Sequence, residues 1–459
     1  MPPRAVAAAA ILLGAPFLVW PAFVNAYPLL FSDTGAFLAQ TLVPLMIWDK
    51  PWVYGPLLHL FHWRLTLWLP LAAQALMLSH LLWLTGRVVW GRRPFGHVAL
   101  CAFAGLATTA PYTIGLLMPD VFTPAIVLCL FLLGFGANRL SRGELVWAFL
   151  VASLGIAAHL SHLPMAAALV ALGLVLRRTL RPVARMASPL VAAVLILLGT
   201  NLVGHDRLSL SPHGSTFLLA RLQDDGPAAR TLAALCPERG WYLCGFVDRL
   251  PMDSDLFLWE RDSPVNQDAD GNHRFLGGMM LSGEAREIVS ETIRREPFGV
   301  ARTMIGNALR QLTLMRAGDT LGWDHVEVAV GTRIREFFPE REATRFEASG
   351  QAQGTLLARL APLLPWHPLI VVLGLPVGLW AAIRARRRGH VRAFALVLVV
   401  LGGAAANAFA AGALSKPHHR YQARIAWLIP VAATMALFPA PSPRRARDEA
   451  LAKRPIGRV

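Results

Sequence analysis

Long apolar runs recur along this chain, and the segments between them carry most of the charged residues. A membrane-crossing α-helix needs roughly 20 consecutive apolar residues, because the hydrocarbon core of a bilayer is about 30 Å thick. Runs close to this length predict ten membrane-spanning helices, of which the sixth is short. They cover residues 5–26, 65–86, 98–118, 121–137, 145–163, 164–176, 188–204, 366–383, 393–414 and 425–440.

The composition supports the same class of protein. Of the 459 residues, 55% are hydrophobic and 16% are charged, and the mean hydropathy is +0.47. Soluble domains carry about 25% charged residues, and a chain this apolar does not stay disordered in water. We therefore expect an all-α polytopic membrane protein with about ten transmembrane helices. The short sixth run and the tight turn at residues 118–120 leave nine or eleven spans open.

Lys and Arg gather in alternate loops, and this sets the expected orientation. Short cytoplasmic loops carry an excess of these residues. With the N-terminus inside, the inner segments hold 21 of them and the short outer loops hold five. We expect both termini to be cytoplasmic, and the design fits the inner membrane of a bacterium. The first run resembles a signal peptide in part, but its length favours an uncleaved signal anchor.

One polar stretch, residues 205–361, holds the other 18 Lys and Arg and 22 of the 28 acidic residues. The chain as a whole has a formal charge of +16, and the stretch has a charge of −4. The positive excess therefore reflects loop orientation, and we expect no nucleic-acid partner. We expect this stretch to be a mostly helical periplasmic domain. The rest divides into a transmembrane module at 1–204 with an outer loop at 27–64, a second module at 362–440, and a basic cytoplasmic tail at 441–459.

Two features of the polar stretch predict local structure. Cys236 and Cys244 lie on the side of the membrane where disulfides persist, so we expect them to be bonded to each other. A helix is expected from Glu284 and is interrupted at Pro297. Beyond that proline, apolar residues recur at intervals of three and four up to Leu312. This second helix either lies on the membrane surface or covers the core of the domain.

Three acidic side chains outside the polar stretch are expected at the outer surface of the membrane, namely Asp33, Asp49 and Asp120. A carboxylate near the hydrocarbon edge costs a few kcal/mol unless it is paired or hydrated, so it is a candidate for function. The alternative role of Asp33 and Asp120 is to cap the helices that follow them.

The outer loops also carry more basic groups than expected, most densely at residues 416–420. The candidate cations are Lys50, Arg64, Lys416, His418, His419, Arg420 and Arg424. Their alternative role is to attract lipid head groups. Histidine pairs at 59 and 62 and at 159 and 162 have a spacing that allows a metal site, but hydrogen bonding at the membrane interface is the favoured interpretation.

Several of these residues lie in short motifs. Residues 27–38 read Tyr-Pro-Leu-Leu-Phe-Ser-Asp-Thr-Gly-Ala-Phe-Leu, and residues 50–58 read Lys-Pro-Trp-Val-Tyr-Gly-Pro-Leu-Leu. Residues 116–120 read Leu-Leu-Met-Pro-Asp, and Arg420-Tyr421 precedes the last span. This order resembles the GT-C-type glycosyltransferases, which are polytopic enzymes that use polyprenyl-phosphate sugars. The resemblance covers about residues 5–135 and 415–435. It departs from the family at Thr34, where some members carry a second acid, and in the position of the polar domain, which many members carry at the C-terminus.

The resemblance implies a GT-C-like fold and transfer of a sugar from a polyprenyl-phosphate donor to a lipid or glycan acceptor at the outer face. Asp33 would be the general base. Asp120 would orient the acceptor, stabilise positive charge on the sugar or help to bind a divalent metal ion. The seven cations named above would hold the donor phosphate. The chain lacks a P-loop and a nucleophile-elbow serine, so the sequence does not support ATP-driven transport or Ser-His-Asp hydrolysis. The alternatives to the glycosyltransferase are a non-enzymatic transporter or flippase and an envelope assembly protein.

Overall fold

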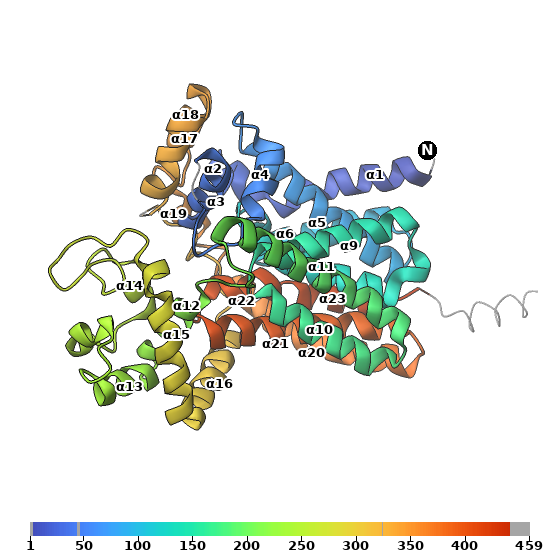
Figure 1. The fold of residues 1–459 in the computed structure, drawn as a ribbon. Helices are drawn as coiled ribbons and strands as arrows, with labels where there is room; N and C mark the ends of the chain where they lie inside the picture. The colour runs from blue at the N-terminus through green and yellow to red at the C-terminus, as the bar shows by residue number, and fades with distance from the viewer. Residues whose placement is uncertain (1–2, 44–45, 324, 441–459) are drawn as a thin grey trace, which may run out of the picture.

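The computed structural model describes residues 3–43, 46–323 and 325–440, and these are predominantly helical. Long helices lie side by side in a bundle, and a smaller group of helices projects from one end of it (Figure 1). No strand longer than an isolated bridge occurs within the described ranges. The predicted basic tail at 441–459 lies outside the described residues.

The bundle contains the long apolar helices, and each of the ten predicted spans overlaps one of its helical segments. Its main helices are α1 (Pro3–Gly14), α5 (Trp68–Val89), α6 (Pro94–Ala107), α8 (Phe122–Phe131), α9 (Arg142–Ala158), α10 (His162–Arg177), α11 (Leu180–His205), α20 (Trp366–Arg387), α21 (Val391–Leu414) and α23 (Leu428–Leu437). Shorter segments complete it: η1 (Ala15–Leu18), α2 (Trp20–Asn25), α7 (Ala110–Ile114), η2 (Pro119–Val121), η3 (Leu132–Gly136), η4 (Ala137–Arg139) and α22 (His419–Ala426). The first predicted span is broken near Pro16 and Pro21, since proline lacks the N–H that a continuous helix needs.

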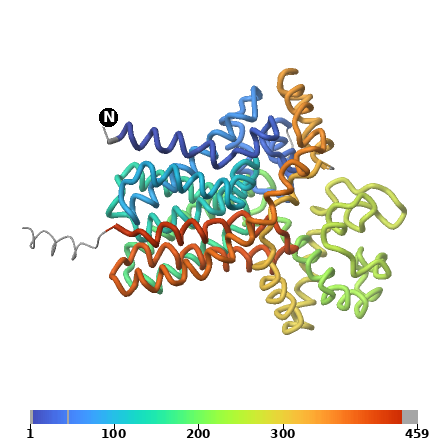
Figure 2. The backbone as a smooth tube through the Cα atoms, turned by 180° about the vertical axis from the view of Figure 1, so that it is seen from behind, coloured from blue at the N-terminus to red at the C-terminus, as the bar shows by residue number. Residues whose placement is uncertain are grey.

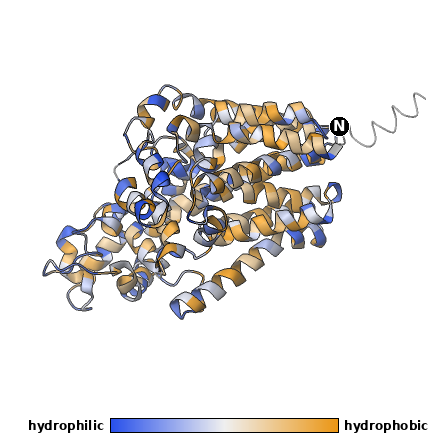
Figure 3. Cartoon of the chain, turned by 90° about the horizontal axis from the view of Figure 1, so that it is seen from above, coloured by the Kyte–Doolittle hydropathy of each residue, from blue (hydrophilic) through white to orange (hydrophobic). Residues whose placement is uncertain are grey.

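Five helical segments in the described part of the chain are long and apolar enough to cross a membrane. They are Trp68–Val89, Pro119–Arg139, Leu180–His205, Trp366–Arg387 and Val391–Leu414. Hydrophobic residues predominate along the bundle, whereas polar residues are more frequent in the projecting group of helices (Figure 3). The structure thus supports a helical membrane protein, and the number of crossings stays a prediction.

The polar stretch 205–361, which we expected to be one domain, contributes to two apolar cores. Its first part encloses a core of its own around Phe257, Leu281 and Ile288. Its second part, which includes Leu321 and Ile334, packs into the core of the bundle. The first part contains α12 (Gly214–Asp224), α13 (Pro227–Leu235), η5 (Tyr242–Arg249), α14 (Ser254–Trp259), α15 (Gly277–Arg295) and α16 (Pro297–Thr313). The second contains η6 (Glu327–Gly331), α17 (Thr332–Phe337), α18 (Glu340–Glu347) and α19 (Leu356–Leu360), and the outer loop before α5 contains α3 (Ser32–Leu42) and α4 (Tyr54–His62).

Within the first part, Cys236 at the end of α13 and Cys244 in η5 form a disulfide. The predicted helix ends before Pro297, and α16 begins there. Early in α16, Val300 packs into the core of the domain. Further along, α16 lies against α21 so closely that a Cβ on Gly412 would be 2.6 Å from the carbonyl oxygen of Asn307. α16 therefore joins this domain, which we call the projecting domain (residues 214–300), to the bundle.

The second part of the polar stretch holds the outer loop in place. The buried side chain of Glu342 accepts hydrogen bonds from the Tyr27 hydroxyl and from the Leu67 backbone N–H, both at 2.8 Å. The side-chain amide of Gln351 accepts from the Leu30 N–H at 3.1 Å and donates to the Leu30 carbonyl at 2.6 Å. These contacts hold the segment that leads into α3.

α3 itself lies unusually close to η6. A Cβ added to Gly35 would lie 2.0 Å from the carbonyl oxygen of Ala329. Backbone atoms cannot move aside as the end of a flexible side chain can, so this approach requires glycine. The contact fixes the first turn of α3, which carries Asp33.

Replacing Gly35 by Ala should therefore lower the free energy of unfolding by about 1–3 kcal/mol, because the added methyl group pushes α3 away from η6. The matched control is Gly143→Ala in α9, where a Cβ would meet no atom within 4 Å. That control should be neutral or stabilising by up to about 1 kcal/mol, since alanine favours helices. Thermal unfolding of both purified variants in one detergent measures the difference, and equal melting temperatures would contradict the close packing.

Candidate functional site

α3 and α22 lie at the end of the bundle that adjoins the projecting domain (Figure 1). Charged side chains from three distant parts of the chain meet there. Asp33 lies in the first turn of α3, and Lys50 lies in the loop that follows α3. Asp120 lies in η2, and Arg420 and Arg424 lie on α22. Ion pairs connect all five side chains, which we call the outer ion cluster. The two carboxylates singled out in the sequence therefore lie on either side of one arginine.

The pair of Asp120 and Arg424 is the buried centre of this cluster. Their side chains are 2% and 1% exposed, and Nη1 of Arg424 donates to Oδ1 of Asp120 at 3.2 Å. Nε and Nη2 of Arg424 donate to Oδ1 of Asn407 at 3.1 and 2.8 Å, and Nη2 also donates to the Ser161 hydroxyl at 2.9 Å. Hydrogen bonds to the remaining polar atoms help to offset the cost of burying an ion pair. Asn407 and Ser161 supply those bonds for the guanidinium. Oδ2 of Asp120 is buried and has no hydrogen-bond partner among the described residues.

Arg420 lies between the two carboxylates. Its Nη1 is 3.8 Å from Oδ2 of Asp33, and its Nε is 4.0 Å from Oδ1 of Asp120. Both distances exceed the 2.7–3.2 Å of a normal N–H···O hydrogen bond. Nη1 is buried and has no hydrogen-bond partner among the described residues, and the ring of Phe31 lies 4.6 Å from the guanidinium carbon. Arg420 therefore keeps donor capacity for another anion.

Lys50 connects Asp33 to a third carboxylate. Its Nζ is 3.2 Å from Oδ1 of Asp33 and forms a second ion pair with Asp49. Burial alone would lower the pKa of Lys50, but the negative charges of Asp33 and Asp49 outweigh burial and raise that pKa above its usual value. Lys50 therefore stays protonated. Asp33 remains the accessible acid of the cluster, because its side chain is 32% exposed.

Neither Asp33 nor Asp120 caps a helix with its side chain, which was the alternative interpretation of the sequence. The N-cap of α3 is Phe31, whose N–H donates to the Thr34 hydroxyl at 3.1 Å. The N-cap of η2 is Met118, and no side-chain cap hydrogen bond occurs there. A negative charge in the first turn still interacts favourably with the helix dipole. The direct partners of both carboxylates, however, are cations on other elements.

Two of the predicted cations, Lys416 and His418, pair with the projecting domain instead. Nζ of Lys416 lies 2.5 Å from Asp253 and 3.0 Å from Asp255, and Nε2 of His418 lies 3.2 Å from Asp255. Burial alone would raise the pKa of Asp255, but hydrogen bonds from His418 and Lys416 and their charges lower it to about 2. These contacts hold the segment before α22 against α14.

Arg64 and His419 also have other partners. The guanidinium carbon of Arg64 lies 5.9 Å from the ring centre of Phe337. Nδ1 of His419 accepts a hydrogen bond from the backbone N–H of Arg316 at 3.1 Å. Of the seven cations predicted to bind phosphate, three form ion pairs with Asp33 or Asp120 among the described residues, namely Lys50, Arg420 and Arg424.

The described residues do not fit a metal centre, because no three His, Cys, Asp or Glu side chains come together as ligands in that part of the chain. His162 contacts the Thr123 hydroxyl at 2.8 Å and the Gly155 carbonyl at 2.7 Å. Nδ1 of His59 contacts the Thr41 hydroxyl at 3.1 Å. Both rings thus make ordinary hydrogen bonds.

An aromatic wall adjoins Lys50, and the sequence analysis did not identify it. The ring of Trp48 stacks on Phe217 at a centroid distance of 5.4 Å and lies 6.2 Å from Trp259. Nζ of Lys50 is 5.7 Å from the centre of the Trp259 ring. A small cavity of about 20 Å³ beside the aromatic wall is lined in part by Trp48, Lys50 and Phe217. Rings and charged groups occur together in many ligand sites, but this cavity is far smaller than the roughly 300 Å³ of a small-molecule site.

Comparison with family models, curated proteins and solved structures finds no match for this chain. Its class therefore rests on its own features, which are a helical bundle with helices long and apolar enough to cross a membrane and a buried ion pair at one end. The likeness to GT-C-type enzymes rests on the sequence motifs alone.

Removing Arg424 should destabilise the fold strongly, because Asp120 would remain buried without its main counter-charge. We expect Arg424→Gln to lower the free energy of unfolding by about 3–5 kcal/mol. The double variant Asp120→Asn/Arg424→Gln should recover part of that loss. The control Arg230→Gln, which breaks a pair with Glu296 in which Arg230 is 59% exposed, should cost less than about 1 kcal/mol. Unfolding curves that coincide for Arg424→Gln and Arg230→Gln would show that the buried pair is not structurally important.

Proposed function

We propose that this protein is a membrane glycosyltransferase that moves a sugar from a polyprenyl-phosphate donor to a lipid or glycan acceptor at the outer face of a bacterial inner membrane. The observation that carries the proposal is the position of Arg420 between Asp33 and Asp120. That position places an accessible carboxylate beside a cation with unused hydrogen-bond donors. The three residues come from the motifs that resemble GT-C-type enzymes.

The proposed orientation agrees with the arrangement of the bundle. α1 begins at one end of the bundle, and α23 ends at the same end (Figure 2). The projecting domain lies at the opposite end, next to α22 (Figure 1), which carries Arg420 and Arg424 of the outer ion cluster. If the arginine-rich end is cytoplasmic, as the loop charges indicate, then the cluster and residues 214–300 face the periplasm.

In this mechanism, Arg420 and Lys50 hold the phosphate of the donor. Charge-assisted hydrogen bonds from guanidinium and ammonium groups suit phosphate oxygens. As the bond between the anomeric carbon and the phosphate oxygen breaks, its electron pair stays on that oxygen, and the two cations stabilise the developing charge. Asp120 is too deeply buried to reach the reactants. It acts as a positioning residue, because it fixes Arg420 and Arg424 on α22.

Asp33 accepts the proton of the acceptor hydroxyl as the hydroxyl oxygen attacks the anomeric carbon. This role needs an ionised carboxylate within hydrogen-bond reach of the acceptor. Asp33 is the accessible acid of the cluster, and its carboxylate forms ion pairs with Lys50 and Arg420. The exposed ring of Trp259, beside Lys50, offers an apolar face for the C–H side of a sugar.

Asp33→Asn should reduce sugar transfer by about 10²–10⁴-fold, because the amide cannot take up the proton. Its thermal unfolding should stay close to wild type, since Asp33 is partly exposed. The assay follows labelled hexose or pentose from a polyprenyl-phosphate donor into membranes that contain the protein and its natural acceptor. Full transfer by the variant would exclude Asp33 as the base. Movement of the labelled lipid across the membrane without transfer would favour a flippase.

Lys50→Gln and Lys416→Gln provide a matched pair for the phosphate site. Lys50→Gln should reduce transfer by about tenfold or more, the amount expected when a hydrogen bond from a charged donor to the phosphate is lost. Lys416→Gln should leave transfer within about threefold of wild type, because the ion-pair partners of Lys416 are Asp253 and Asp255 of the projecting domain, whereas Lys50 pairs with Asp33 of the outer ion cluster. The same transfer assay measures both variants at equal protein levels. A larger loss in Lys416→Gln would place the donor phosphate away from the outer ion cluster.

A further inference from the structure

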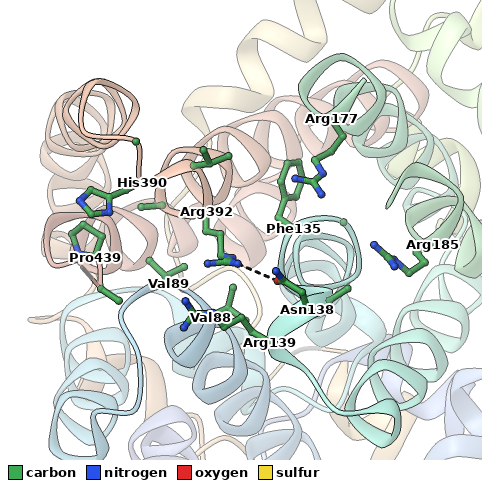
Figure 4. A pocket seen from close by; sticks show the side chains of 16 residues that line it. Val88, Val89, Phe135, Asn138, Arg139, Arg177, Arg185, His390, Arg392 and Pro439 are labelled. Carbon is green, nitrogen blue, oxygen red and sulfur yellow. Dashed lines mark hydrogen bonds between the residues drawn. The ribbon is translucent and has the colours of Figure 1, made fainter. Parts of the chain in front are cut away.

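A second cationic site lies at the other end of the bundle, the end that the loop charges predict to be cytoplasmic. A cavity of about 400 Å³ opens there between the ends of α5 and α10, the start of α11, the turn before α21 and residues 439–440. Four arginines line it, and we call them the inner arginine set: Arg139, Arg177, Arg185 and Arg392. Figure 4 shows their guanidinium groups arranged around the shared cavity. None of the lining residues, all of them in the described part of the chain, is acidic.

The inner arginine set has no carboxylate partner in the salt bridges of the described residues. Arg392 donates to Oδ1 of Asn138 at 3.1 Å, which is a neutral acceptor. Arg177 lies 5.4 Å from the ring of Phe135, and its buried Nε has no hydrogen-bond partner in the same part of the chain. Arg87, which directly precedes the lining residue Val88 on α5, does pair with an acid, Glu144.

Loop orientation accounts for arginines at this end, but it does not account for their convergence. The positive-inside rule is satisfied when each side chain extends separately to lipid head groups or water. Four like charges around one cavity repel one another unless an anion lies between them. Planar guanidinium groups match phosphate oxygens in a two-pronged geometry. Basic pockets between membrane helices on the cytoplasmic side are known to take phosphate head groups.

We propose that this cavity binds a phosphate group, carried either by an anionic lipid head group or by a soluble phosphate compound. Its volume is sufficient for a group larger than phosphate alone, since small-molecule sites run from about 300 Å³ upward. Apolar residues form part of the wall, including Val88, Val89 and Val391. The site is separate from the outer ion cluster and does not depend on the proposed sugar transfer.

The test measures binding to the full-length protein in detergent through ligand-induced thermal stabilisation. One series of samples receives short-chain phosphatidylglycerol in the micelles, and a second receives inorganic pyrophosphate. Arg177→Gln/Arg392→Gln should weaken binding of at least one probe by about 100-fold, or about tenfold for each charged hydrogen bond that is lost. The control Arg178→Gln/Arg388→Gln removes the same charge from exposed positions that do not line the cavity, and its affinity should stay within about threefold of wild type.

A lipid-only response identifies a head-group site, and a pyrophosphate-only response identifies a site for a soluble phosphate compound. Either result supports the proposal. If neither probe stabilises the wild-type protein, or if both double variants weaken binding equally, the proposal is wrong. Val391→Trp is a second test variant, for use if Arg177→Gln/Arg392→Gln does not fold. It narrows the cavity from an exposed position without removing a charge. It should weaken binding by about tenfold or more, and unchanged binding in that variant would also overturn the proposal.

Discussion

The buried carboxylate of Asp120 is the constraint on which the structure at the end of the bundle next to the projecting domain depends. Burying an ion costs several kcal/mol unless a counter-charge and hydrogen bonds accompany it. Arg424 supplies the charge at 3.2 Å, and Asn407 holds Arg424 through two hydrogen bonds. This requirement ties η2, α21 and α22 together. α22 has eight residues, too few to be stable as an isolated helix, so its position depends on this network.

Asp33 is held against that network by residues that are remote in the chain. The carboxylate of Glu342 accepts a hydrogen bond from the hydroxyl of Tyr27, which is 315 residues away in the sequence. This bond helps to fix the segment before α3. Gly35 allows α3 to approach η6 at backbone distance. The proposed base is therefore carried by a short helix that two other parts of the chain support. Such support from packed elements keeps catalytic groups in a narrow range of positions.

Hydrophobic periodicity predicted the helices well, because it records which residues must leave water. The apolar runs coincide with helical segments, and the break at Pro297 follows from the missing N–H of proline. Asp33 and Asp120 were identified because carboxylates are rare near the membrane edge. Periodicity does not show which partner covers a face, so the division of 205–361 between two cores was not predicted.

Long-range pairing explains what the sequence did not reveal about the site. Lys416 is a plausible phosphate ligand by its position in the loop, yet Asp253 and Asp255 neutralise it from more than 150 residues away. The wall of Trp48, Phe217 and Trp259 combines three segments whose proximity only folding creates. The inner arginine set is similar, since positive-inside counting assigns its members to one side of the membrane without placing them around one cavity.

Native mass spectrometry of the detergent-purified protein tests the central claim, that Arg420 binds the phosphate of a lipid-linked sugar. Our account predicts a co-purified polyprenyl phosphate or its sugar ester on the wild-type protein. It also predicts that Arg420→Ala greatly reduces this adduct, whereas Arg177→Gln/Arg392→Gln retains it. Ordinary phospholipid alone, unchanged by Arg420→Ala, would contradict the account and favour a transporter or an assembly protein.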